Sequence, residues 1–162
     1  MRILTIILLL ASSFRAIADI EAASQAYRNK DYGTAFEAFT ELASNGDARS
    51  QAILAMMYKY VESTAVDLEQ SFNWYLEAAF QWHPSAQYNV GTMLIDGVGV
   101  TKDTQAAKEW LSRAVNSGHP GARDKLSTLT GEAEIVKLAE PIAWSRSWNF
   151  RLPNDIRFQS PN

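Results

Sequence analysis

Residues 83–118, HPSAQYNVGTMLIDGVGVTKDTQAAKEWLSRAVNSG, contain two amphipathic segments on either side of a glycine-rich turn. The second segment has small or apolar residues at intervals of three and four, the spacing of one face of an α-helix. They are Ala107, Trp110, Leu111, Ala114 and Val115. Asp103 stands where this helix needs an N-cap, and Gly118 stands where its end needs a left-handed backbone. The stretch therefore predicts two antiparallel helices.

The same pattern recurs along the chain at intervals of 36 residues. Asp31 and Asp67 align with Asp103, and Trp74 aligns with Trp110. The apolar face of the helix after each aspartate keeps one phase in all three units. Repeats of this length are stacks of helix pairs, in which each pair buries its apolar faces against its neighbours. We therefore predict an all-α fold, an α-solenoid of about four antiparallel helix pairs with a 36-residue repeat.

The N-terminus differs from the repeats. A positive residue, Arg2, precedes a short apolar run, and Ala16 and Ala18 offer small side chains for cleavage before Asp19. This pattern predicts a secretory signal peptide, and the run is shorter than the roughly 20 residues that span a bilayer. We expect a periplasmic protein, or alternatively a secreted one, without stable membrane insertion after cleavage. The expected divisions are a signal peptide (1–18), a repeat domain (19–145, units about 20–46, 47–82, 83–118 and 119–145) and a C-terminal tail (146–162).

Composition excludes several classes of function. The chain has 18 acidic and 15 basic residues, and loss of Arg2 and Arg15 with the signal peptide changes the net charge from −3 to −5. An acidic protein has no general attraction for nucleic acid. The chain has no cysteine, and its two histidines, His83 and His119, stand at equivalent turn positions one repeat apart. We therefore expect no disulfide, metal or cofactor. No nucleophile elbow, phosphate loop or metalloprotease helix is present, so we predict a protein that is not an enzyme.

Several residues of the third unit fit one known repeat pattern. They are Ala86-Gln87-Tyr88-Asn89-Val90-Gly91, Gly97-Val98-Gly99-Val100, Asp103, Ala107, Trp110, Ala114 and Gly118. This unit resembles the Sel1-like repeat (SLR), a relative of the tetratricopeptide repeat (TPR), and the resemblance covers roughly residues 20–145. It implies a bacterial exported member with a right-handed, TPR-like superhelix. It also implies a scaffold that binds a protein or peptide on its concave face. Two alternatives stay open: a cell-wall-associated enzyme or enzyme accessory, and a secreted factor that binds a host protein.

The second unit departs from this pattern at two places. Residues 59–64 stand where the family has a Gly-x-Gly turn, and Trp82 replaces the glycine that ends the helix. We expect the turn at Trp82 to be built differently, with the indole covering the helix end.

By analogy with TPR arrays, exposed positions of each first helix line the concave face. These positions are Arg49, Ala52, Met56, Lys59 and Tyr60, then Ser85, Tyr88, Thr92, Ile95 and Asp96. The candidate partner-binding residues are Arg49, Met56, Lys59, Tyr60, Tyr88, Thr92 and Asp96, with tyrosine and methionine as anchors and the charges as polar contacts. The alternative is that Tyr88 packs in the core and the charged groups only solvate a helix face.

The tail from residue 146 to residue 162 combines three arginines with aromatic residues and one acid, Asp155. Trp148, Phe150 and Arg151 are its candidate contact residues. One interpretation is a terminus that packs over the last helix pair. The other is a linear segment that docks into a partner or into the protein's own groove.

Overall fold

The computed structural model describes residues 19–60 and 66–130, and this part of the chain is helical with short turns. A helical segment over residues 19–28 precedes six helices in the described chain. These are α2 (Tyr32–Ser44), α3 (Ala48–Tyr60), α4 (Leu68–Phe80), α5 (Pro84–Asp96), α6 (Thr104–Asn116) and α7 (Ala122–Thr130). Each helix packs against the next one in the chain, so the prediction of an all-α solenoid is confirmed.

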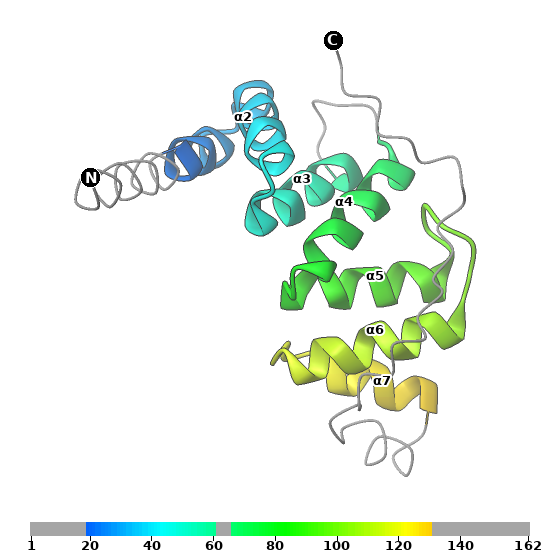
Figure 1. Ribbon diagram of the computed structural model, residues 1–162. Coiled ribbons are helices and arrows are strands. Elements are labelled where there is room, and N and C mark those ends of the chain that lie inside the picture. Colours follow the sequence, from blue (N-terminus) through cyan, green and yellow to red (C-terminus); the bar gives the residue numbers. More distant parts are fainter. Residues whose placement is uncertain (1–18, 61–65, 131–162) are drawn as a thin grey trace, which may run out of the picture.

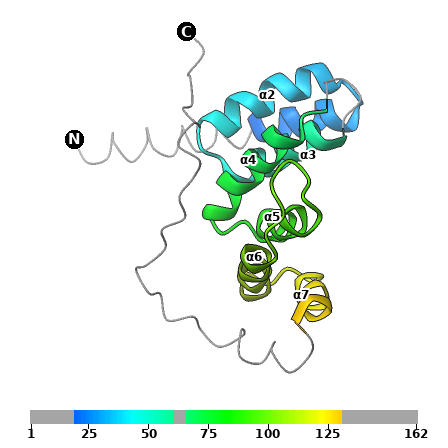
Figure 2. The same ribbon diagram turned by 90° about the vertical axis from the view of Figure 1, so that its right-hand side faces the viewer.

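The helices form an elongated stack. The N-terminal segment and α2 lie at one end, and α7 lies at the other (Figure 1). In a view turned by 90°, α3, α5 and α7 lie on one side of the stack, while α4 and α6 lie on the other (Figure 2). The predicted signal peptide, the end of the fourth unit and the C-terminal tail lie outside the described residues.

The repeated aspartates begin the second helix of each unit. Asp31, Asp67 and Asp103 precede α2, α4 and α6, and each side chain accepts a hydrogen bond from the backbone N–H three residues later. An N-cap of this kind satisfies one of the N–H groups that the first helical turn leaves unpaired. The prediction that these residues are helix caps is confirmed.

Three helices end in the same left-handed turn. Gly46, Trp82 and Gly118 have φ values of +90°, +67° and +81°. In each turn the next N–H donates to a carbonyl five residues back, as in the bond from His83 N to Ala78 O at 3.1 Å. The expectation that Trp82 builds a different turn and covers the helix end is therefore wrong. Trp82 takes the conformation of the glycine that it replaces, and its side chain is 54% exposed.

Substitutions in these turns should change stability by different amounts. An added Cβ at Gly118 meets no atom within 4 Å, so Gly118→Ala changes only the backbone preference. We expect it to lower the free energy of unfolding by about 1 kcal/mol, because a left-handed conformation is unfavourable for L-residues. Trp82→Gly removes strain of this kind, but it also removes an indole that is only 54% exposed and adds entropy to the unfolded chain, so it should lower the free energy of unfolding by less than Gly118→Ala does. Urea unfolding followed by circular dichroism measures the free energy of unfolding of both variants. A Gly118→Ala protein as stable as the parent would contradict the left-handed turn at Gly118.

The core consists of two clusters along the stack. The first lies between the N-terminal segment, α2 and α3 and contains Phe39, Leu54 and Met57, none more than 1% exposed. The second extends from α3 to α6 and includes Tyr75 and Val90. Because each cluster joins neighbouring helices, the stability of the array is built from contacts between adjacent units.

Buried amides link each unit to the preceding one. Gln51 Nε2 donates to the carbonyl oxygen of Ala43 at 3.2 Å, and Gln87 Nε2 donates to that of Ala79 at 3.3 Å. In both cases the first helix of a unit adds a hydrogen bond to a carbonyl near the end of the helix before it, which also accepts from the backbone N–H of Gly46 or Trp82 in the turn. The glutamines stand 36 residues apart, so this contact follows from the repeat.

Candidate interaction surface

The exposed sides of α3, α5 and α7 carry equivalent positions of successive units, and we call this surface the first-helix face. Tyr60 at the end of α3 is 64% exposed, and the Nζ of Lys59 lies 4.8 Å from the centroid of its ring. A cation at this distance is attracted by the face of the ring. Asp96, one repeat after Tyr60, is exposed at the end of α5. This end of the face therefore presents an aromatic ring, an ammonium group and a carboxylate.

Arg49 is exposed in the first turn of α3, at the other end of the same helix. It lies near the N-cap of α5, where His83 Nδ1 accepts a hydrogen bond from the N–H of Ala86 at 3.3 Å. Burial lowers the pKa of His83, with Asp47 raising it and Arg49 lowering it further. The neutral imidazole that accepts this bond is consequently the favoured form at neutral pH.

Tyr88 packs against another residue of the repeat array and also remains partly exposed. Its ring stacks on His119 with the centroids 4.3 Å apart and the planes 15° from parallel, and it remains half-buried. Gly121 lies beside both rings, since its added Cβ would be 3.7 Å from His119 and 3.9 Å from Tyr88. Burial lowers the pKa of His119. The stack thus anchors α5 to the turn before α7, and one edge of Tyr88 stays accessible.

Four of the positions assigned to the face contribute less than expected. Ala52 is only 8% exposed and belongs to the core, while Met56 and Ile95 are half-buried and pack against the same cluster. The Oγ1 of Thr92 donates to the Tyr88 carbonyl at 3.0 Å. The side chains of Ala52, Met56 and Ile95 pack toward neighbouring helices, because the apolar stripe of a first helix contacts helices on both sides.

The corresponding positions of α7 were not among the predicted residues of this face. Adding 36 to Tyr88 and Thr92 gives Asp124 and Thr128, and both are exposed in the structure. The same offset that aligned the aspartates would have found them. Asp124 and Thr128 extend the first-helix face onto a third helix, and Asp124 adds a carboxylate at the position equivalent to Tyr88. The tail candidates Trp148, Phe150 and Arg151 lie outside the described residues.

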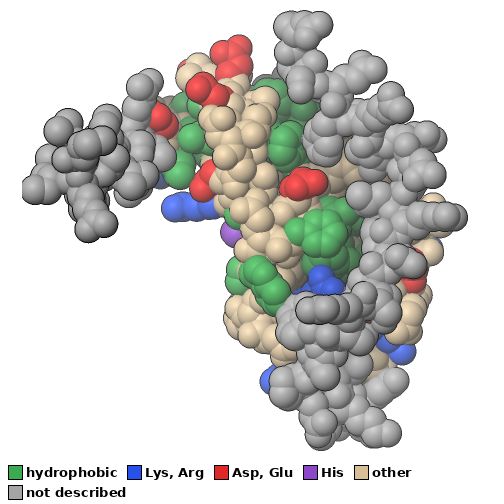
Figure 3. All heavy atoms as spheres, in the orientation of Figure 1, with side chains coloured by type: hydrophobic (Ala, Val, Ile, Leu, Met, Phe, Trp, Pro, Cys, Tyr) green, Lys and Arg blue, Asp and Glu red, His purple; other side chains and the backbone are tan. Residues whose placement is uncertain are grey.

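A second group of aromatic side chains lies on the second helices. Phe80 is 50% exposed and meets Trp110 edge to face at 5.4 Å, and the Arg113 guanidinium lies 4.5 Å from the Trp110 ring centroid. Figure 3 shows that hydrophobic side chains also reach the surface elsewhere on the face it displays. Phe80 and Arg113 both contact the Trp110 ring, so this group stabilises the packing of α4 on α6.

The described residues offer no chemistry for a metal. Within 19–60 and 66–130, no three histidine, aspartate or glutamate side chains come close enough to share an ion. His83 caps a helix and His119 stacks on a tyrosine, so each histidine has a structural role of its own. No helix in the same ranges has the length and apolarity that a membrane crossing requires.

A stack of helix pairs with an extended face of exposed side chains defines the class of helical repeat scaffolds. A family model described as "Sel1 repeat" matches residues 48–79 and 84–119. The crystal structure of a Sel1 repeat protein from Oxalobacter formigenes has a TM-score of 0.65 and 32% identity, and the alignment covers 79% of this chain and 99% of that one. This chain belongs to the Sel1 repeat family, whose members are protein-interaction scaffolds and generally non-catalytic.

Other relatives are longer than this chain. A protective antigen present in uropathogenic Escherichia coli strains displays an SLR fold and has a TM-score of 0.67 at 27% identity, over 74% of this chain and 26% of that one. An exopolysaccharide production negative regulator of Rhizobium leguminosarum bv. viciae is 31% identical over 66% of this chain and 45% of its own length. This chain therefore spans less than half of that regulator.

Proposed function

We propose that this protein is an exported adaptor that binds a protein or peptide on the concave face, formed by α3, α5 and α7. The observation that carries the proposal is the set of exposed side chains at equivalent positions of successive first helices. Tyr60, Asp96 and Asp124 are accessible there, although the helices that hold them are packed against others. Exposed aromatic and charged groups on a rigid, extended surface suit recognition of another chain.

The exported location rests on the N-terminal sequence alone. The apolar run and the small residues before Asp19 have the arrangement of a signal peptide, which favours the periplasm and also allows secretion. The name of the Rhizobium relative describes a regulator, not an enzyme, and this supports a non-catalytic role for the shared repeats. Lipid and nucleic acid are poor partners for a chain of net negative charge.

The proposal is tested by capturing a partner on the tagged full chain from the periplasmic fraction of the source bacterium. The double variant Tyr60→Ala with Asp96→Lys alters one end of the first-helix face and leaves the buried clusters intact. We expect it to lose the captured protein, because truncating an aromatic anchor typically costs about 2 kcal/mol or more of binding. The captured protein should copurify with the parent at a fixed ratio.

The matched control is Phe80→Ala with Glu37→Lys, which also removes one exposed aromatic ring and reverses one exposed carboxylate, but on the second helices. It should retain the partner. Equal loss in both variants, with unchanged helicity, would contradict binding through the first-helix face. Turnover of cell-wall fragments by the purified chain would instead favour the enzyme alternative, and capture of a host protein alone would favour the secreted-factor alternative.

A further inference from the structure

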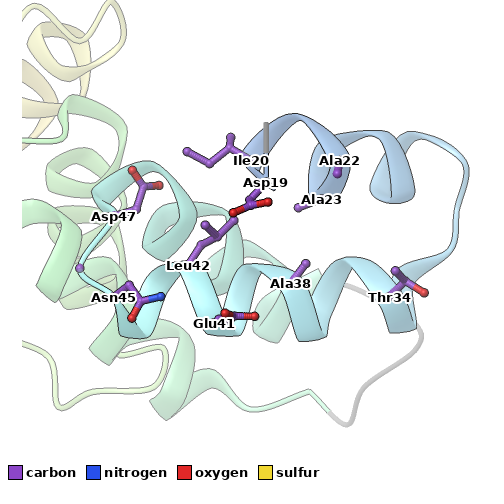
Figure 4. Close-up of a pocket in the computed structure, with 11 residues that line it drawn as sticks. Asp19, Ile20, Ala22, Ala23, Thr34, Ala38, Glu41, Leu42, Asn45 and Asp47 are labelled. Carbon is purple, nitrogen blue, oxygen red and sulfur yellow. The ribbon is translucent and has the colours of Figure 1, made fainter. Parts of the chain in front are cut away.

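A hollow of about 650 Å³ lies between the N-terminal helical segment and α2, next to the turn that leads into α3. Figure 4 shows side chains from the two helices facing each other across it. Ala22 and Ala23 line it from residues 19–28, and Ala38 and Leu42 line it from α2. Alanine side chains are too small to fill the space between the two helices, which leaves the hollow. Because alanine and leucine line it, its floor is mainly apolar.

The rim of this hollow is acidic. Asp19, Glu41 and Asp47 line it, and no lysine, arginine or histidine is among the residues of 19–60 and 66–130 that line it. Asp47 also caps α3 by accepting a hydrogen bond from the N–H of Ser50 at 2.7 Å, which fixes the position of its carboxylate. An apolar floor beneath carboxylates favours an occupant that combines an aromatic or aliphatic side chain with positive charge.

One segment of this chain has that composition. Residues 146–162 contain Trp148 and Phe150 between Arg146 and Arg151, with a third arginine at position 157 and a single acid. The segment is therefore basic, whereas the whole chain has a net charge of −3. Its aromatic residues alternate with arginines closely enough for one ring to enter the hollow while a guanidinium contacts the rim.

The chain outside the described helices is long enough for this contact. Residues 131–147 lie between α7 and Trp148 and can extend over roughly 55–60 Å at about 3.3–3.6 Å per residue. From α2, which lines the hollow, to α7 the chain takes successive steps between packed helices about 8–10 Å apart, so the axes of α2 and α7 are separated by at most about 50 Å. The tail of one molecule can thus reach the hollow of the same molecule.

We propose that the C-terminal tail docks intramolecularly into this hollow, with an aromatic ring of residues 148–150 on the apolar floor and arginine side chains at the carboxylate rim. The contact ties the last unit of the array to the first. It goes beyond the proposed adaptor function and does not depend on it, because the hollow involves the N-terminal segment and α2, not the first-helix face.

The absence of cysteine from the chain allows a direct test. Asn149→Cys in the full chain carries a nitroxide label, and amide NMR signals are compared with the label oxidised and reduced. We expect the oxidised label to broaden the signals of Ala22, Ala38 and Leu42 and to leave those of α5 sharp. This broadening should persist unchanged on dilution, since the contact lies within one molecule.

Glu41→Lys reverses one rim charge and should abolish the broadening. Glu37→Lys is the matched control, since Glu37 is exposed one turn earlier on the same helix and does not line the hollow. If Glu41→Lys disturbs folding, Arg151→Glu in the tail removes the same attraction without touching α2. Sharp signals at the hollow with the oxidised label, broadening that disappears on dilution, or equal effects of Glu37→Lys and Glu41→Lys would overturn the proposal.

Discussion

Gly99→Ala should lower the free energy of unfolding by at least about 2 kcal/mol. Gly99 has a φ of +69°, and a Cβ added there would lie 1.9 Å from the carbonyl oxygen of Leu68 and 2.4 Å from its carbonyl carbon. The obstacle is backbone at the start of α4, so it cannot move away as a flexible side chain would. The turn between α5 and α6 must instead separate from α4. Urea unfolding followed by circular dichroism measures the loss.

Gly33→Ala provides a control with the opposite sign. Gly33 is exposed in the first turn of α2, and its nearest neighbour to an added Cβ is the Oδ1 of Asp31 at 4.0 Å. Alanine is favoured over glycine in a helix by about 0.5–1 kcal/mol, so this variant should match or exceed the parent in stability. A Gly99→Ala protein as stable as the parent would mean that the turn does not approach α4 as closely as the structure shows.

Phe39→Ala should lower the free energy of unfolding by about 3–5 kcal/mol, because it leaves a cavity in the first core cluster. The side chain of Phe39 is 1% exposed and packs between α2, α3 and the N-terminal segment. Since units of an array contact only their neighbours, the loss should be local. Hydrogen exchange should show faster opening of α2 and α3 than of α5 and α6.

Phe80→Ala is the matched control, since it removes the same side chain from a position that is 50% exposed. The free energy of unfolding should fall by less, about 1–2.5 kcal/mol, because the variant loses the edge contact with Trp110 and the burial of about half of one side chain. A uniform increase in exchange through all helices of the Phe39→Ala protein would contradict a stability built from contacts between adjacent units.

The repeat made most of the fold predictable. A spacing of 36 residues located Asp31, Asp67 and Asp103 as caps, because a cap depends on local sequence. The prediction for the turn at Trp82 was wrong for a physical reason: backbone hydrogen bonds to Ala78 and Ala79 set this turn, and they impose a left-handed conformation even without glycine. The local backbone hydrogen bonds of the turn here overrode the conformational preference of one residue.

The candidate surface was less predictable than the fold. Periodicity placed Tyr60, Asp96 and Ala52 on one helix face, but it cannot say how deeply the next helix covers a position. Tyr60 and Asp96 are exposed, whereas Ala52 is buried. The stack of Tyr88 on His119 joins residues from different units, and only their placement in space reveals it. The hollow beside α2 likewise depends on how two helices pack, which no sequence period encodes.

The most direct test of the adaptor proposal is hydroxyl-radical footprinting of the chain with its captured partner. Tyr60 on the first-helix face and Phe80 on the second helices are both at least half exposed in the free chain, so each reports on its own surface. The account predicts that oxidation of Tyr60 falls in the complex while oxidation of Phe80 stays unchanged. Protection of Phe80 with unchanged oxidation of Tyr60 would contradict it and place the partner on the opposite side of the array.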